Sequence, residues 1–403
     1  MDWRSIIANY EVKNLKAYQP RAYAIAYRLP EKILSYTFSI QQELPGGAVL
    51  TAAYVGSQGR NLFLRSWTNR TLGLTMNADG TAKRITEFDA RFNEAGIDYK
   101  TSGGTDHYDS LQTSIQRRFK QGLTIGGQWT WGHSMGNTGG SNEAQTTVDP
   151  TNFSRDRGNN AYDIRHSVNI NALYDLPFGK GHLYGANLNP VLDAFVGGWD
   201  VGGIVNARTG IPMDITIDRP DIAYYVPSTG LYFTGVQKDA SGNIISVPVL
   251  ANPYGGAFRS NRRPSVIAGV DPFLHTGDRR YFLNPAAFTI PAPGQFGNLG
   301  RFPVHGPGMA QVDFTVQKKF PITERVNLEF RSEFYNILNR TNFANPPVRL
   351  ANALGTGANK LQPGQPYSLA AAGGAFGIST ATVDRGVGLG TNRQIQLSLR
   401  LNF

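Results

Sequence analysis

Apolar and polar residues alternate with a period of two in several segments of this 403-residue chain. Such alternation is typical of a β-strand with one apolar and one polar face, because successive side chains of a strand point to opposite sides. In the final segment, 393–403, every second residue from Ile395 to Phe403 is apolar and the residues between them are polar. The pattern predicts an all-β, antiparallel protein.

Nine segments follow this pattern, and eight of them are expected to pair as hairpins. The turn between the first two strands is predicted at 44–47, where Pro45 is followed by two glycines. The predicted hairpins are 33–43 with 50–56, 108–119 with 123–133, 166–176 with 199–207, and 311–319 with 326–337, and the ninth strand is 393–403.

The connections between these strands alternate between short and long. The four long ones, 57–107, 134–165, 208–310 and 338–392, are rich in Gly, Pro, Asn and Asp, and all are expected at one end of the sheet. Short turns at one end and long loops at the other are typical of bacterial outer-membrane barrels. The segment 208–308 is therefore predicted to be a long extracellular loop, with a small hairpin that pairs 231–237 with 243–250.

Composition agrees with strands that cross a membrane. Hydrophobic residues make up 40% of the chain, and no run of about 18 apolar residues indicates a transmembrane helix. Strands of about eleven residues, tilted by about 45°, span about 25 Å, which is the height of the apolar band of a barrel. Nine strands that begin outside the cell predict only the carboxy-terminal part of a larger barrel, because closed bacterial barrels have an even strand number.

The final strand resembles the closing strand of bacterial outer-membrane barrels. Its apolar face and aromatic terminus are the feature that the barrel assembly machinery reads in that class of protein, so this machinery and outer-membrane lipid are the expected partners. The alternative is an amphipathic edge strand of a soluble sandwich. The residues of the predicted assembly signal are Ile395, Leu397, Leu399, Leu401 and Phe403.

A row of charged residues predicts that the polar face of the sheet contacts water. In the segment 326–337, Glu329, Arg331 and Glu333 alternate with apolar residues. Three charges on one face do not pack into a dry core without partners. We expect them to face a hydrated lumen or a polar plug; the alternative is the solvated face of an ordinary antiparallel sheet.

The net charge of +10 and the absence of cysteine narrow the possible functions. The basic residues are scattered as pairs with no nucleic-acid-binding module, so nucleic acid is not an expected partner. Thiolate metal sites, disulfides and cysteine nucleophiles are excluded. The amino terminus shows no basic segment followed by an apolar one, so no signal peptide is predicted.

Five runs of sequence carry a family resemblance. They are QQELPGGAVLTAAYVGSQGRNL, YDSLQTSIQRRFKQGLTIGGQWTWGHSM, YDIRHSVNINALYDLPFGKG, GGWDVGGIVNARTGIPMDI and EFRSEFYNILNRTNFANP. Together they resemble the Oar-like branch of TonB-dependent outer-membrane transporters. This resemblance implies a barrel of about twenty-two strands, an internal plug and contact with TonB. The sequence shows neither a plug nor the other amino-terminal parts of the family, so we expect one partial barrel domain over 1–403, either truncated or continued upstream.

No arrangement of residues indicates catalysis, and no cofactor or metal is predicted. The six histidines lack the spacing of zinc motifs, and no serine lies in a nucleophile elbow. Ligand capture is expected in the loops, where aromatic and cationic side chains mix. The alternative is that these side chains pack against the loops themselves. The candidates are Tyr224, Tyr225, Arg262, Arg263, Arg279 and Arg280.

The sequence leaves several functions open. The leading hypothesis is the barrel of a TonB-dependent transporter that takes up a large nutrient or chelate of unidentified nature. A surface receptor or an adhesion or secretion-linked barrel that transports nothing is the second hypothesis. A soluble β-rich binding protein is the third, and an outer-membrane hydrolase is disfavoured because no nucleophile and base are apparent.

Overall fold

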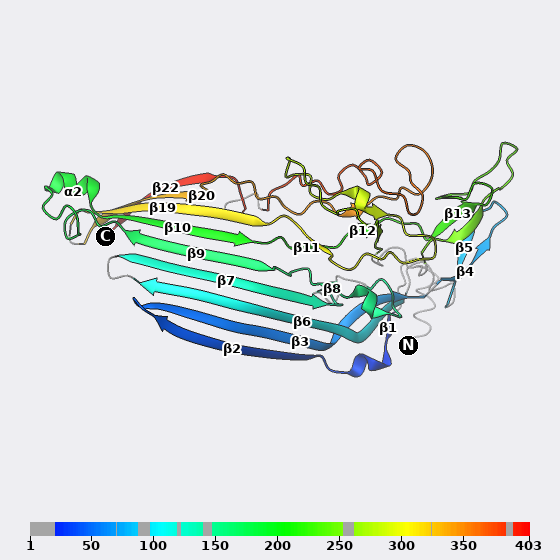
Figure 1. Cartoon of the computed structure of the whole chain (residues 1–403), viewed down its shortest axis with the longest axis horizontal. Coiled ribbons are helices and arrows are strands. Elements are labelled where there is room, and N and C mark those ends of the chain that lie inside the picture. The colour runs from blue at the N-terminus through cyan, green and yellow to red at the C-terminus, as the bar shows by residue number, and fades with distance from the viewer. Residues whose placement is uncertain are drawn as a thin grey trace, which may run out of the picture.

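The computed structural model describes residues 21–69, 71–87, 97–118, 122–139, 147–252, 262–323, 325–383 and 390–403. Its main feature is a large antiparallel sheet whose strands follow one another in the order β2-β3-β6-β7-β9-β10-β19-β20-β22 (Figure 1). These strands are β2 (Lys32–Leu44), β3 (Ala48–Thr68), β6 (Ile97–Arg118), β7 (Leu123–Gly136), β9 (His166–Asp175), β10 (Trp199–Arg208), β19 (Met309–Pro321), β20 (Asn327–Tyr335) and β22 (Gln394–Asn402).

These strands confirm the nine segments predicted from the alternation, and each predicted hairpin is present. The turn residues 119–121 between β6 and β7, and the amino-terminal residues 1–20, lie outside the described residues. Two short strands pair with inner strands of the sheet. β1 (Arg21–Tyr23) runs parallel to β6, and β8 (Gly158–Asn159) runs antiparallel to β7. The sequence did not predict either of them.

The predicted loop 57–107 is wrong at both ends, because β3 and β6 continue as a ladder from Ala48↔Arg117 to Thr68↔Ile97. The register shifts between Gly59 and Leu64, and Asn61 has a positive φ of 56°. A bulge of this kind interrupts the period of two. For this reason the alternation stops near Gly56 although the strand does not.

The connection between β9 and β10 contains one short helix, α2 (Pro190–Val196), which the sequence did not predict. The side chain of Asn189 caps it by accepting a hydrogen bond from the Leu192 amide at 2.8 Å. No helix in the described parts of the chain is long and apolar enough to cross a membrane.

The register gives the sheet one apolar and one polar face. Leu50 lies opposite Ile115, and Phe330 lies opposite Leu399, whereas Thr51 lies opposite Ser114. Residues that face each other across an antiparallel ladder lie on the same side of the sheet. The apolar side chains are exposed, with Leu399 at 67%. Such exposure is what a face covered by lipid requires.

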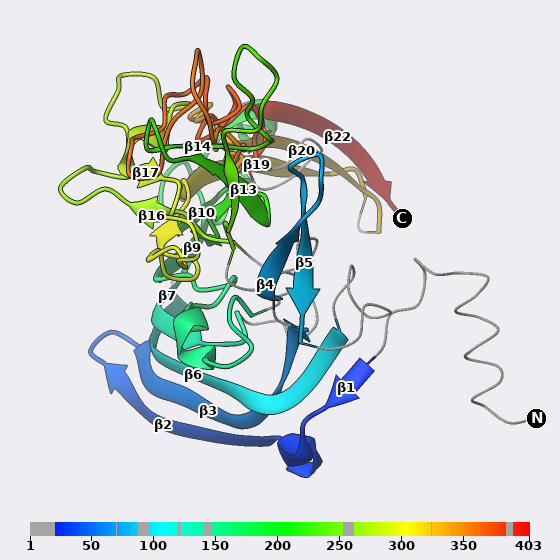
Figure 2. The same ribbon diagram turned by 90° about the vertical axis from the view of Figure 1, so that its right-hand side faces the viewer.

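The sheet is open. Among the described residues, β2 pairs only with β3 and β22 pairs only with β20, so one edge of each strand is free. Viewed from the end, the sheet is curved like part of a barrel wall (Figure 2). The structure is therefore a curved antiparallel sheet with two edges, and not a closed barrel.

The long connections are not independent loops, because those after β10 and β20 fold together into a compact unit. We call the described residues of 209–308 and 336–393 the outer unit. Its core includes Ile215, Leu283, Phe288, Leu350 and Phe376, which are almost fully buried. It lies beyond one end of the sheet, opposite the end that carries α2 (Figure 1). The described parts of the four connections predicted to be long thus gather at one end, whereas the connection that contains α2 lies at the other end.

Short strands organise the outer unit. A parallel pair, β12 (Thr216–Ile217) with β21 (Arg349–Leu350), links its two halves. The others are β11 (Pro212–Met213) with β18 (Val304–His305), β16 (Ser265–Val266) with β17 (Phe288–Thr289), and the sheet β14 (Leu231–Phe233), β13 (Ile222–Val226) and β15 (Val247–Leu250).

The predicted hairpin of 231–237 with 243–250 is correct only at its tip. Lys238 pairs with Ile244, and Asp239 accepts hydrogen bonds in the turn. Farther from the tip, β14 and β15 do not pair with each other, because β13 lies between them. The prediction failed because the short strand at 222–226 was not recognised as a third partner.

The two faces of β22 give a matched pair of substitutions. Leu399→Arg places a charge on the apolar face, whereas Ser398→Arg places it on the polar face. A cation near the middle of the lipid-facing band costs about 2–4 kcal/mol, and lumen substitutions have little effect. We expect Leu399→Arg to lower the amount of urea-resistant protein in outer-membrane fractions and Ser398→Arg to leave it unchanged. Equal effects of the two substitutions would contradict the assignment of the faces.

Candidate functional site

The charged row on β20 is satisfied within itself. Arg331 Nη2 lies 3.2 Å from Glu329 Oε1, and Arg331 Nη1 lies 3.7 Å from Glu333 Oε1. The Arg331 side chain is 42% exposed, and its neighbours across the ladder, Gln317 and Ser398, are also polar. The row therefore forms a polar, solvent-accessible strip on the polar face of the sheet.

Two of the predicted ligand-capture residues pack inside the loops. Tyr224 is buried, and its hydroxyl accepts a hydrogen bond from the Ala82 amide at 3.3 Å. Ala82 begins β5 (Ala82–Thr86), which forms a hairpin with β4 (Thr71–Met76), so Tyr224 joins that hairpin to the outer unit. Tyr225 packs on Tyr232 with ring centroids 4.9 Å apart. The ring of Tyr224 is enclosed in this structure, and capture of a ligand by this residue stays a prediction.

Arg262 and Arg263 lie inside the loops and make internal ion pairs, and ligand capture by them stays a prediction. Arg262 Nη2 lies 2.5 Å from Asp221 Oδ1, and its Nη1 donates to the carbonyl oxygen of Arg219. Arg263 Nη2 lies 2.7 Å from Asp156 Oδ1, and both of these side chains are almost fully buried. Buried arginines are rarely left without a carboxylate, and each of these two side chains has one.

Arg279 and Arg280 do lie at the surface. Arg280 Nη2 is 2.6 Å from Asp278 Oδ2 in an exposed pair, and hydrogen bonding to Asp278 raises the pKa of Arg280. The Arg279 guanidinium lies 5.9 Å from the centre of the Phe343 ring. Ligand capture by this exposed pair of arginines stays a prediction.

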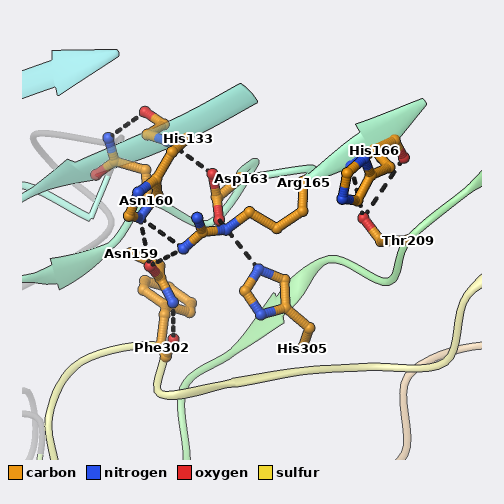
Figure 3. A network of polar contacts seen from close by, with 10 residues as sticks. His133, Asn159, Asn160, Asp163, Arg165, His166, Thr209, Phe302 and His305 are labelled. Atoms are coloured by element: carbon orange, nitrogen blue, oxygen red, sulfur yellow. Dashed lines mark hydrogen bonds and ion pairs between the residues drawn. The ribbon is translucent and has the colours of Figure 1, made fainter. Parts of the chain in front are cut away.

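A polar site joins the outer ends of the strands to the outer unit, and the sequence did not identify it. We call His133, Asp163, Arg165 and His305 the rim network (Figure 3). Arg165 Nε lies 2.9 Å from Asp163 Oδ2, and Arg165 Nη2 lies 2.7 Å from His133 Nε2. His305 Nε2 lies 3.0 Å from the same Asp163 oxygen. Asp163 therefore holds three segments that are distant in sequence.

Two asparagines next to this network bind neighbouring strands and the outer unit. Asn160 donates to Asp106 Oδ1 at 2.6 Å and to Ser134 Oγ at 2.7 Å. Asn159 donates to the carbonyl oxygen of Phe302 at 2.9 Å (Figure 3). Together these bonds fix the segment before β19 against the ends of β6, β7 and β8.

The charge of Asp163 is stabilised by its partners. Burial acts to raise its pKa, but the hydrogen bonds from His305 and the Ser134 amide and the charge of Arg165 outweigh burial, so the pKa lies below its usual value. Asp163 Oδ1 accepts the Ser134 amide at 2.7 Å. The carboxylate is therefore ionised throughout the neutral range.

A cavity of about 530 Å³ opens beside the rim network. It combines apolar walls with potential donors of the histidine and arginine side chains, which suits a small ligand with a polar or anionic group. The described residues contain no cluster of three or more His, Asp or Glu side chains placed to hold a metal ion. The cavity is lined by His166, Val168, Ala207, Arg208, Thr209, Gly210, His305, Gly306 and Gly308.

The lowered pKa of Asp163 predicts a loss of stability in acid. A group whose pKa is lower in the folded state contributes stability above its unfolded pKa, and this contribution disappears as the pH falls through the folded value. Because the unfolded pKa is about 3.9, we expect protection of 302–306 from hydrogen exchange to fall below about pH 5. In Asp163→Asn, protection should be lower at pH 7 and less dependent on pH. The control Asp278→Asn should leave 302–306 unchanged; the same pH profile in all three proteins would contradict the role of Asp163.

Comparison with known proteins identifies the class of this structure. Residues 7–396 match a family described as an outer membrane beta barrel domain. The solved structure of the outer membrane transporter YddB from Escherichia coli is similar at a TM-score of 0.37 and 9% sequence identity, over 96% of this chain and 35% of that one. This chain thus spans about a third of the length of that transporter. A search of curated proteins gives no match. Since the family match covers almost the entire sequence, this chain belongs to the outer membrane β-barrel domain family and is a protein of the outer membrane.

Proposed function

We propose that this chain is a partial barrel domain of a TonB-dependent transporter of the Oar-like branch. It would supply nine strands of a barrel of about twenty-two strands. The observation that carries this proposal is the wide, curved, two-faced sheet whose edge strands β2 and β22 are each unpaired on one side among the described residues. A sheet of this form needs further strands before it can enclose a lumen.

The charged row on β20 supports a plugged lumen. Arg331 is accessible on the polar face and is flanked by Glu329 and Glu333. These side chains contact water where they are exposed, and they can exchange those contacts for polar contacts with a plug domain. The plug would leave the lumen and return to it during transport. The plug and TonB would be the protein partners, and no cofactor is needed.

The outer unit supports a receptor role at the cell surface. Its buried core gives the loops a fixed shape, and binding sites are often built on segments that a scaffold holds in place. Arg279 and Arg280 are exposed on it and are suited to an anionic nutrient or chelate.

The same outer unit favours a second function. A compact extracellular unit joined to the strands by the rim network also suits a surface receptor or an adhesion or secretion-linked barrel that transports nothing. The two functions differ in whether the lumen contains a plug.

Site-specific photo-crosslinking separates these functions. A photoreactive amino acid is placed at Arg331, on the polar face, or at Leu399, on the apolar face, in cells that produce the complete protein. The transporter proposal predicts that position 331 forms an internal or protein adduct with a plug and that position 399 forms none. If position 331 gives no polypeptide adduct while the protein is folded in the outer membrane, the transporter proposal fails and the second function is favoured.

The 403-residue chain by itself is not expected to transport. Its edge strands would leave backbone groups without partners in lipid. Liposomes containing only this chain should therefore release no entrapped dye or ions through a defined pore. Single-channel conductance or uptake by such liposomes would contradict the proposed dependence on further strands.

A further inference from the structure

The connection between β9 and β10 exposes an apolar surface at the end of the sheet opposite the outer unit (Figure 1). None of the seven residues of α2 is buried, and Phe195 is 73% exposed. A helix on a water-covered surface directs its apolar side chains towards the protein instead. We call the exposed apolar residues of this connection the turn patch: Phe178, Leu183, Tyr184, Val191, Leu192, Phe195 and Val196.

The helix is oriented with its apolar side outward and its charge inward. Val191 and Phe195 are four residues apart and therefore lie on one side of α2, whereas Asp193 lies on the other side. Asp193 is the one charged residue in the sequence of α2. Its Oδ1 accepts a hydrogen bond from the Lys180 amide at 2.7 Å, so the carboxylate is bound within the connection. This orientation is the reverse of the one that water favours.

Two side chains from the apolar face of the sheet fix the end of α2. Lys318 lies opposite both Trp199 and Phe330 across its two ladders, and Phe330 belongs to the apolar face. Trp199 Nε1 donates a hydrogen bond to the carbonyl oxygen of Phe195 at 2.8 Å. Lys318 Nζ donates to the carbonyl oxygen of Gly197. The end of α2 is therefore continuous with the margin of the face that suits lipid.

Lys318 indicates where the membrane boundary lies. Although this residue is on the apolar face, its side chain is almost fully buried, and Nζ lies 5.1 Å from the ring centres of both Trp199 and Phe320. Aromatic rings gather at the level of the lipid headgroups in membrane proteins, and their faces attract cations. The turn patch thus adjoins an aromatic and cationic margin of the lipid-facing surface.

We propose that the turn patch inserts into the periplasmic leaflet of the outer membrane, where the acyl chains of phospholipids cover it. The short connections of such barrels face the periplasm. With seven residues, α2 is about 10 Å long, so it would lie along the interface and not cross the membrane. Lys180 is exposed in the same connection and supplies a cation for anionic headgroups. This contact would fix the depth of the sheet in the membrane.

The inference does not depend on the transporter proposal. It rests on the family of this chain and on the assignment of the apolar face to lipid. A barrel without a plug would make the same contact with phospholipid. A failure of one proposal therefore leaves the other standing.

Spin labelling tests the contact directly. The 403-residue sequence contains no cysteine, so a nitroxide can be attached at one chosen position of it. The complete protein, in a cysteine-free form, is placed in vesicles of phosphatidylethanolamine and phosphatidylglycerol. A nitroxide at Phe195→Cys should collide more with oxygen, which is concentrated in lipid, than with a water-soluble nickel chelate. The control Asn187→Cys, at an exposed polar position of the same connection, should show the opposite preference.

Two results at position 195 would overturn the proposal. A preference for the nickel chelate would mean that water covers the turn patch. Low access to both reagents would mean that protein covers it, either a second copy of this chain or another polypeptide.

A charge within the turn patch provides a second test. With the nitroxide at Val191→Cys, the added substitution Phe195→Glu should change the preference from oxygen to the nickel chelate, because a carboxylate is costly in hydrocarbon. Asn187→Glu should leave the preference for oxygen unchanged. A mobility change on boiling shows that the barrel is folded in both variants. An unchanged preference in Phe195→Glu would overturn the proposal.

Discussion

Everything in this structure depends on the pairing of backbone groups where water is absent. In the hydrocarbon core of a membrane, amide and carbonyl groups find no hydrogen bonds outside the protein, so a sheet must have no free edge there. Seven inner strands of the main sheet have partners on both sides, whereas β2 and β22 each have one. The two faces of the sheet suit lipid and water, but its two edges do not suit lipid. The proposed partial barrel would therefore need further strands at these edges.

A second constraint shapes the region outside the membrane. The connections there bury arginines, and each buried arginine must find negative charge or acceptors. Asp156 forms an ion pair with Arg263 and lies 3.6 Å from Arg301. Asp221 pairs with Arg262, and Asp163 pairs with Arg165. The Asp156 pairs join the connection after β7 to the connection after β10, the Asp221–Arg262 pair joins two segments within the connection after β10, and Asp163 and Arg165 lie in the same segment. The hydrophobic core around Phe288 then gives the assembled loops their stability.

The strands could be predicted from sequence because lipid and water impose a period of two on each of them. The prediction ended near Gly56, shortly before the bulge around Asn61, although β3 continues to Thr68. The core of the outer unit was missed for a different reason. Its residues, such as Ile215, Leu283 and Leu350, come from segments that are not periodic and meet only through tertiary contacts. The rim network was missed because His133 and His305 are far apart in sequence, and Asp163 alone carries no recognisable motif.

The most direct test of this account is the size of the folded species in native outer membranes. An antibody to residues 393–403 would be used on outer-membrane extracts, with unheated and boiled samples compared by electrophoresis. The account predicts that the unheated species belongs to a barrel larger than this 44.0 kDa chain can form and that its mobility changes on boiling. A heat-modifiable species of the size of this chain alone would mean that its two edges close without further strands, which would contradict the account.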